Sequence, residues 1–174
     1  MSPSGLGRPF RRFAATSPPQ SRALGEKPNG HKHMEVKQLY KDVVLRMLGK
    51  FQLLEFALKQ YIGLAYKMIQ ELADDKVPFH FSEKDVENYP LERLANIFAK
   101  LNDNSDLSKK INRLRESRNH IAHKALLLVT GRRLDRGEIE DRYIEFTMME
   151  DELTECLGEV IDELKSLSNS RKKA

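Results

Sequence analysis

The stretch MEVKQLYKDVVLRMLGKFQLLEFALKQYIGLAYKMIQEL, residues 34–72, determines the fold class. Its apolar side chains recur at steps of three and four residues, which is the spacing of one face of an α-helix. The pattern predicts one long amphipathic helix, or two helices with a bend near Gly49. A helix of this length is expected to pack against others in a bundle. The predicted stripe consists of Val36, Leu39, Val43, Met47, Phe51, Leu54, Leu58, Ile62, Ala65, Ile69 and Leu72.

Two shorter amphipathic segments follow the long one. Pro90 suits the first position of a helix that ends near Leu101, because proline lacks the backbone N–H that a first turn leaves unpaired. The turn at 102–105 consists of Asn, Asp and Ser, residues that cap helices, so another helix is expected over 106–127. The positions predicted to be buried in the first of these two helices are Leu91, Leu94, Ile97, Phe98 and Leu101.

The segment before the last helix is ambiguous. Residues 142–146 alternate polar and apolar side chains like a strand, so we expect a loop or a short β-hairpin within 128–146. Residues 147–150 have the pattern of a capping box, which predicts the start of the last helix. That helix is expected to bury Leu153, Leu157, Val160, Ile161 and Leu164. The predicted fold is all-α, an up-and-down bundle of four to five helices.

Composition divides the chain into a basic N-terminal segment and a nearly neutral remainder. Residues 1–33 carry six basic side chains and one acidic side chain. Subtracting them from the totals leaves 24 basic and 25 acidic residues in 34–174, a net charge of −1. We expect 1–33 to be a disordered basic tail, or sequence upstream of a true start at Met34. One helical domain is expected over 34–168, followed by a disordered C-terminus at 169–174.

Several classes of protein are excluded by composition. Cys156 is the one cysteine, so neither an internal disulfide nor a CxxC metal site can form. The sequence has no run of 18 apolar residues that would span a membrane, and we expect a cytoplasmic protein. Because 34–174 is close to neutral, overall charge does not argue for nucleic-acid binding.

Arg118 occupies an unusual position on the helix expected over 106–127. At about 100° per residue, it lies in the middle of an apolar stripe. A guanidinium cannot lose its charge by deprotonation, so it needs a carboxylate partner, an aqueous cleft or an anionic ligand. Glu55, on the first long segment, is the candidate for a structural partner. The stripe around Arg118 consists of Leu107, Ile111, Leu114, Ile121, Ala122 and Ala125.

A second face of the same helix carries polar side chains suited to proton transfer. Arg115, Asn119 and His123 follow one another at intervals of four, and Glu116 and His120 lie beside them. An imidazole can carry protons near neutral pH. An arginine can hold a phosphate with two parallel hydrogen bonds and stabilise the charge that gathers on it. These groups suit attack of a ribose 2′-hydroxyl on the adjacent phosphate, which requires no metal and no cofactor.

An ideal helix does not aim Arg118 and His123 at the same point, since the two positions are about 140° apart. Either the arginine side chain wraps around the helix, or the helix is distorted, or a second copy of the chain completes the site across a twofold axis. His120 and His123 together offer only two metal ligands, so we expect no metal site.

The segment RNHIAH at 118–123 is similar to the Arg-x4-6-His signature of HEPN-domain proteins, in its Arg-Asn-x-x-Ala-His form. The resemblance covers about residues 34–168. It includes GKFQLLEFAL at 49–58, which resembles the first helix of HEPN members in which an acid faces the site. The resemblance implies a metal-independent endoribonuclease, active as a homodimer. Such enzymes occur in toxin–antitoxin, abortive-infection and RNA-processing systems.

The resemblance also implies roles for individual residues. Arg118 would contact the scissile phosphate, His123 would act as acid or base, and Asn119 would support both. RNA is then the substrate, and a cognate antitoxin or inhibitor protein is a further expected partner. Two alternatives stay open: a non-catalytic module for dimerisation or partner binding, and a regulator that binds a nucleotide or small anion without cleaving RNA. The residues expected to support the site are Glu55, Arg115, Glu116 and His120.

The densest basic patch outside the N-terminal segment follows the motif helix. It is GRRLDRG at 131–137, and its basic residues are Arg132, Arg133 and Arg136. These side chains would lead an RNA strand into the site through phosphate contacts. The alternative is a solvated turn.

Overall fold

The computed structural model describes residues 29–73, 76–82, 84–125 and 136–172, with the backbone alone described at 29–34, 123, 124 and 136. These residues form five α-helices and one short π-helical segment, and they include no β-strand. The predicted all-α class with four to five helices is therefore confirmed. None of the described helices is long and apolar enough to cross a membrane.

The first helix, α1 (Asn29–Ala73), is continuous and has 45 residues. At 1.5 Å per residue it spans about 68 Å. It passes through Gly49 as regular helix, so the alternative of two helices is wrong. The helix begins five residues before Met34, and residues 29–33 therefore do not belong to the predicted tail.

The last helix, α6 (Arg136–Arg171), corrects the prediction for residues 128–146. Residues 136–146 are helical, so the predicted loop or hairpin is wrong there, while 128–135 lie outside the described residues. Ile139, Phe146 and Leu153 recur every seven residues and are buried at 1% exposure or less. In residues 136–146 the seven-residue helical period therefore determines the structure, and the two-residue alternation that predicted a strand does not.

The predicted start of the last helix at 147–150 is also wrong. Thr147 lies inside α6, where its hydroxyl donates to the carbonyl oxygen of Tyr143, one turn earlier, at 2.8 Å. A threonine hydroxyl can bond within a helix in this way as well as cap one, so the capping pattern is ambiguous. At its other end α6 continues to Arg171, so residues 169–171 are helical and not disordered.

Three short helices connect the two long ones: α2 (Lys84–Glu87), α3 (Leu91–Leu101) and α4 (Ser105–His120). Pro90 directly precedes α3. The side chain of Asn104 caps the third by accepting a hydrogen bond from the N–H of Leu107 at 3.1 Å, as the turn at 102–105 predicts. The π-helical segment is η1 (Ile121–Ala125).

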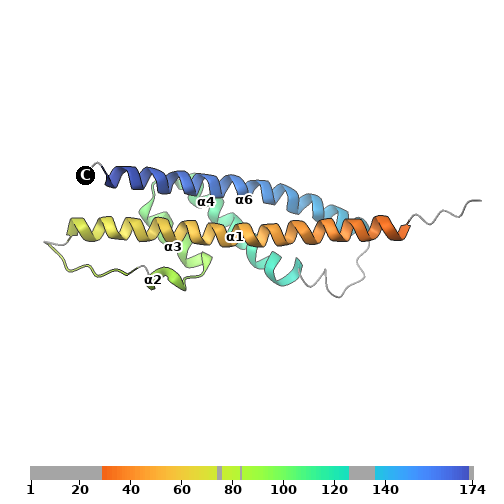
Figure 1. The fold of residues 1–174 in the computed structure, drawn as a ribbon, viewed down its shortest axis with the longest axis horizontal. Helices are drawn as coiled ribbons and strands as arrows, with labels where there is room; N and C mark the ends of the chain where they lie inside the picture. The colour runs from red at the N-terminus through yellow and green to blue at the C-terminus, as the bar shows by residue number, and fades with distance from the viewer. Residues whose placement is uncertain (1–28, 74–75, 83, 126–135, 173–174) are drawn as a thin grey trace, which may run out of the picture.

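Helices α1 and α6 lie side by side and run in the same direction (Figure 1). The rings of Tyr40 and Phe146 stack toward their beginnings, and Glu71 pairs with Arg171 toward their ends. In an up-and-down bundle each helix reverses the direction of the one before it, and the first and last of five such helices run parallel, as α1 and α6 do. The extended connection after α1 carries the chain back along this helix before α3 begins, which leaves the last helix free to run parallel to the first.

Helix α4 runs antiparallel to this pair. Its first residues lie near the end of α6, where Asn104 donates to Glu163 at 3.1 Å. Later in α4, Arg113 pairs with Glu152, eleven positions earlier in α6. The middle of α4 therefore lies beside the middle of α6.

The core lies between the long helices and the shorter ones that cover one side of them. Glu150, at 7% exposure, is the one charged residue buried among the described residues. Leu39, Ile69, Leu72 and Ile161 were predicted to be buried and are exposed. A stripe drawn at steps of three and four drifts around a helix as long as α1, so its outer members leave the buried face. Ile161 directly follows the buried Val160 and lies about 100° further around α6. The largest buried side chains are Phe51, Phe98, Phe146, Met47, Leu54, Leu58, Ile62, Leu94, Leu107, Ile111, Leu114 and Ile121.

Candidate active site

The predicted motif lies at the C-terminal end of α4 and in η1. The apolar stripe of α4 is buried as predicted, with Leu107, Ile111 and Leu114 at 1% exposure or less. Ile121 and Ala125 continue the buried stripe into η1, which contacts α1. This burial holds the motif helix against α1 and fixes which of its polar residues face solvent.

Arg118 reaches across from α4 to α1. Its Nη2 atom lies 3.4 Å from Oε1 of Glu55, the structural partner considered from the sequence. The arginine side chain is 39% exposed and the glutamate side chain 20% exposed. An ion pair this long and this hydrated contributes only about 0–1 kcal/mol to stability. The guanidinium has five N–H donors in a fixed fork, and Glu55 engages it through Nη2, so capacity for an anionic ligand remains.

The other polar residues of the motif helix do not gather around Arg118. Arg115 turns toward α3, where its Nη1 lies 3.4 Å from Oε1 of Glu92. Glu116, Asn119 and His120 are exposed to solvent. Among the predicted residues whose side chains are described, Arg118 and Glu55 are the pair that the structure brings together.

The motif helix is distorted between Arg118 and His123. It is α-helical up to His120 and π-helical over η1, which contains His123. At the junction the N–H of Ile121 bonds to the carbonyl oxygens of both Arg118 and Ser117. A π turn bonds residue i to i+5 and so winds fewer degrees per residue than an α turn. The angle between positions 118 and 123 is therefore smaller than the roughly 140° of an ideal α-helix.

The π turn bears directly on the geometric difficulty that the sequence raises. Of the three solutions considered, a distorted helix is present in the backbone. π-Helical segments are rare, because a regular α-helix is the more favourable structure. Where they occur, they are frequently found at functional sites. The π turn reduces the angle around the helix axis between positions 118 and 123, but it does not place the two residues on one face of the helix.

The basic patch predicted to guide RNA is largely outside the described residues. Arg132 and Arg133 fall in the segment 126–135. Arg136 is the first residue of α6, and its backbone alone is described. The predicted role of these three arginines stays a prediction.

Neither a metal centre nor a cysteine nucleophile is indicated by the part of the chain that the structure describes. No group of three His, Cys, Asp or Glu residues is placed there to hold a metal ion. Cys156 is buried, and this burial raises the pKa of its thiol to about 12. The thiol is therefore protonated at neutral pH and inert as a nucleophile.

Two features were missed by the sequence analysis. The first is an ion cluster in which the buried Glu150 of α6 pairs with the partly exposed Arg46 and Lys50 of α1. The second is a cleft on α1 that contains Phe56 and Lys59. Both depend on which residues of α1 and α6 lie opposite each other. The sequence carries little signal of this register, beyond the charged residues on the two helices.

No family profile, curated protein or solved structure matches this chain.

Proposed function

We propose that this protein is a metal-independent endoribonuclease of the HEPN type, active as a homodimer. One observation carries the proposal. Arg118 is held loosely at 3.4 Å from Glu55, at a partly exposed position, three residues before a π turn that contains His123. A cation held for structure alone has no need of a distorted helix beside it. A cation that receives a phosphate needs solvent access, spare donors and a nearby proton carrier.

The proposed reaction is cleavage through the ribose 2′-hydroxyl. His123 removes the proton from this hydroxyl as its oxygen forms a bond to the adjacent phosphorus. The bond between phosphorus and the 5′ oxygen breaks, and the imidazolium gives a proton to that leaving oxygen. The products are a 2′,3′-cyclic phosphate and a 5′-hydroxyl, and no metal takes part.

Arg118 and Asn119 would act on the phosphate. The guanidinium would bind two non-bridging oxygens and stabilise the negative charge that increases in the transition state. Glu55 would position the guanidinium without neutralising it, because the pair is long and hydrated. Asn119 is exposed one residue along the helix and would orient the imidazole or donate to a phosphate oxygen.

A second copy of the chain would complete the site. Positions 118 and 123 still diverge around the helix axis despite the π turn, so two copies related by a twofold axis beside η1 would each supply groups to a shared cleft. The exposed residues Glu116, Asn119 and His120 would then lie near the dimer axis. A protein that inhibits the enzyme, such as a cognate antitoxin, would have to cover this same surface.

A non-catalytic module is the second candidate function, and one observation favours it. Leu45, Leu53 and Phe56 of α1 are exposed at 49%, 55% and 61%. Exposed apolar side chains along one helix are typical of surfaces that bind another protein. In this alternative the Arg118–Glu55 pair serves only to attach α4 to α1.

The test is RNA cleavage by the purified full chain in excess EDTA, with analysis of the product ends. Cleavage that survives chelation, leaves 2′,3′-cyclic ends and disappears in His123→Ala and Arg118→Ala supports the proposal. His80→Ala is the matched control, since His80 is an exposed histidine outside the motif. A dimer that cleaves no RNA favours the non-catalytic module. Equal activity in His123→Ala and wild type would refute the assigned site.

A further inference from the structure

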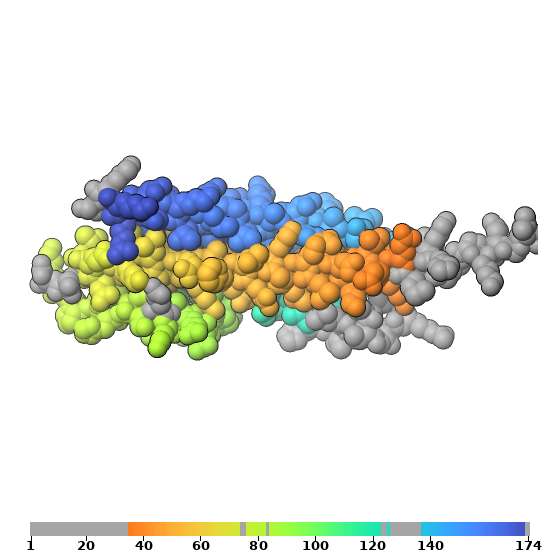
Figure 2. Space-filling model, in the orientation of Figure 1, coloured from red at the N-terminus to blue at the C-terminus, as the bar shows by residue number. Residues whose placement is uncertain are grey.

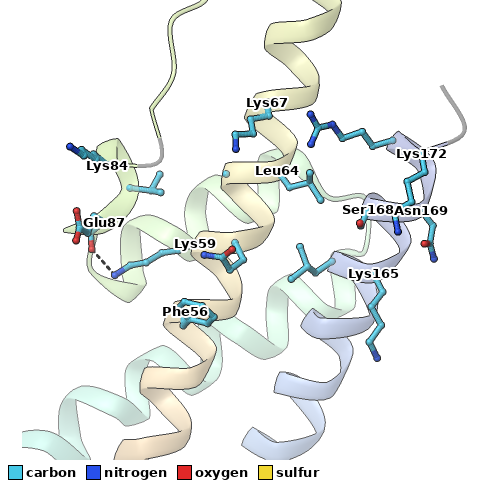
Figure 3. A pocket seen from close by; sticks show the side chains of 15 residues that line it. Phe56, Lys59, Leu64, Lys67, Lys84, Glu87, Lys165, Ser168, Asn169 and Lys172 are labelled. Atoms are coloured by element: carbon cyan, nitrogen blue, oxygen red, sulfur yellow. Dashed lines mark hydrogen bonds between the residues drawn. The ribbon is translucent and has the colours of Figure 1, made fainter.

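A basic cleft crosses the exposed face of α1. Its volume is about 990 Å³, and it is bounded by α2 on one side and by the C-terminal end of α6 on the other (Figure 3). Six basic residues and one acidic residue line it, although residues 34–174 have a net charge of −1. The fold therefore gathers positive charge from three separate helices. The basic residues are Lys59, Lys67, Lys84, Lys165, Arg171 and Lys172, and the acidic residue is Glu87.

Arg171, one of the six basic residues, is balanced by Glu71, which accepts two hydrogen bonds from it. By contrast, Lys59 and Lys165 keep charge available for an anion. The Nζ atom of Lys59 donates to the backbone carbonyl oxygen of Glu87 at 2.6 Å (Figure 3). A carbonyl carries no formal charge, so this contact orients the ammonium group without neutralising it. Lys165 pairs with Asp162 at 2.8 Å, and both side chains are at least two-thirds exposed. Such a surface pair contributes little energy and can give way to a phosphate.

An exposed aromatic ring lies in the same cleft. Phe56 is 61% exposed and sits on α1 about one helical turn before Lys59 (Figure 3). The space-filling view shows that this face of α1 is left uncovered between α6 and the α2–α3 region (Figure 2). Exposure of a phenylalanine ring to water is unfavourable, and the binding of a small inorganic anion would make no use of an aromatic ring. A basic groove combined with an open aromatic ring is the arrangement that binds single-stranded nucleic acid.

We propose that this cleft binds single-stranded RNA, with its phosphates along the lysines and one base stacked on Phe56. The inference rests on the proposed function for naming the polymer as RNA. It extends that function because the cleft begins at Phe56, which directly follows Glu55, the partner of Arg118, about 100° further around α1. A strand held here would enter the site from α1. A duplex is disfavoured, because its bases are already stacked on each other and leave no face for Phe56.

The experiment measures binding separately from cleavage. A fluorescent 2′-O-methyl RNA of about 12 nucleotides is titrated with the full chain and followed by anisotropy, a length within the range of known single-strand sites. This probe has no free 2′-hydroxyl, so it cannot be cut by the proposed reaction. The same sequence is also presented as a duplex, and each titration is repeated at several salt concentrations.

Two pairs of variants carry the test. Phe56→Ala should weaken binding about tenfold, as expected for loss of one base stack. Leu53→Ala is its control, because Leu53 is 55% exposed on the same helix and does not line the cleft. Lys165→Ala should lower the salt slope by about 0.7, as expected for one phosphate contact. Lys109→Ala is its control, since Lys109 forms an equivalent exposed pair with Asp106 outside the cleft.

Each outcome separates this inference from the proposed function. Tight single-strand binding that the two cleft variants weaken and the two controls preserve supports the inference, even if no RNA is ever cleaved. Binding that is insensitive to Phe56 and Lys165, or equal binding of the duplex, overturns it. In that case cleavage that depends on His123 would still stand, and RNA would reach the site by another surface.

Discussion

Two glutamates join α1 to another helix through an arginine, and they do so very differently. Glu150 is 7% exposed and accepts two hydrogen bonds from Arg46, at 2.9 and 2.8 Å, and a third from Lys50 at 2.8 Å. Glu55 has a single contact with Arg118 at 3.4 Å, and the two side chains of this pair are both partly exposed to solvent. The first pair is bidentate and saturated, whereas the second is loose.

The difference shows that one pair attaches two helices to each other, whereas the other leaves its arginine available to a ligand. Hydrogen bonds from Arg46 hold the pKa of Glu150 at about 2, so the carboxylate is charged at any ordinary pH and fastens α6 to α1. Arg118 keeps donors for another anion because its contact with Glu55 is weak. We therefore expect changes at the first pair to affect stability, and changes at the second pair to affect function.

The largest expected effect is on activity at the loose pair. Arg118→Ala should reduce the rate of RNA cleavage by a factor of about 100 to 1,000, the usual loss when one donor to a charged transition state is removed. Its free energy of unfolding should fall by no more than about 1 kcal/mol, because the side chain is part-exposed and its pair is hydrated. Cleavage assays and urea denaturation on the same preparation measure both quantities. Strong destabilisation with retained activity would reverse the assignment.

The next effect is the dependence of stability on pH at the saturated pair. The pKa of Glu150 is lowered from 4.5 to about 2 in the folded state, so below pH 4.5 the unfolded state binds more protons. Its contribution is present above pH 4.5 and is lost as the pH falls toward 2, a change on the order of 3 kcal/mol. Urea denaturation between pH 6 and pH 2 measures it. In Glu150→Gln the decline over this range should be smaller, and equal declines would contradict the assignment.

A direct comparison of the two carboxylates should give a smaller effect. At neutral pH Glu150→Gln should lower the free energy of unfolding by about 2 kcal/mol, because it weakens three charge-assisted hydrogen bonds in a part-buried setting. Glu55→Gln should lower it by less than about 1 kcal/mol, since its pair is hydrated. Matched denaturation curves decide the question, and equal losses would mean that the loose pair is structural after all.

The smallest expected effect is a gain in stability from a substitution within α1. Gly49 is exposed within the helix, and a Cβ atom there would meet no atom within 4 Å. Gly49→Ala should therefore stabilise the protein by about 0.5–1 kcal/mol, the usual difference in helix propensity. Gly158→Ala, in an equally open position on α6, is the comparison. A loss of stability in Gly49→Ala would show that this part of α1 needs the flexibility of glycine.

The local parts of the fold could be predicted from the sequence, and the long-range parts could not. Asn104 caps α4 because its side chain meets an N–H three residues away, and this relation is visible in the sequence. The parallel direction of α1 and α6 depends on contacts between residues about 100 positions apart, such as Glu71 and Arg171. Residues 142–146 alternate like a strand, which predicts a loop or short hairpin there, whereas the seven-residue period that places them in a helix is visible only over several turns.

The candidate site divides in the same way. The contact between Arg118 and Glu55 could be anticipated, because a charged residue in an apolar stripe requires a partner. The π turn could not, since its sequence reads as ordinary α-helix. The cleft was missed because its lysines come from α1, α2 and α6, and only the assembled fold places them together.

The parallel arrangement of α1 and α6 also has a consequence during synthesis on the ribosome. Tyr40 of α1 leaves the ribosome about 100 residues before Phe146 of α6, the ring on which it stacks. Until then the apolar stripe of α1 can be covered only by α3 and α4, and the carboxylate of Glu150 is not yet there to bind Arg46. The apolar face of α1 is therefore open to aggregation until α6 has been made, so the yield in the cell should depend on chaperones that shield long amphipathic helices.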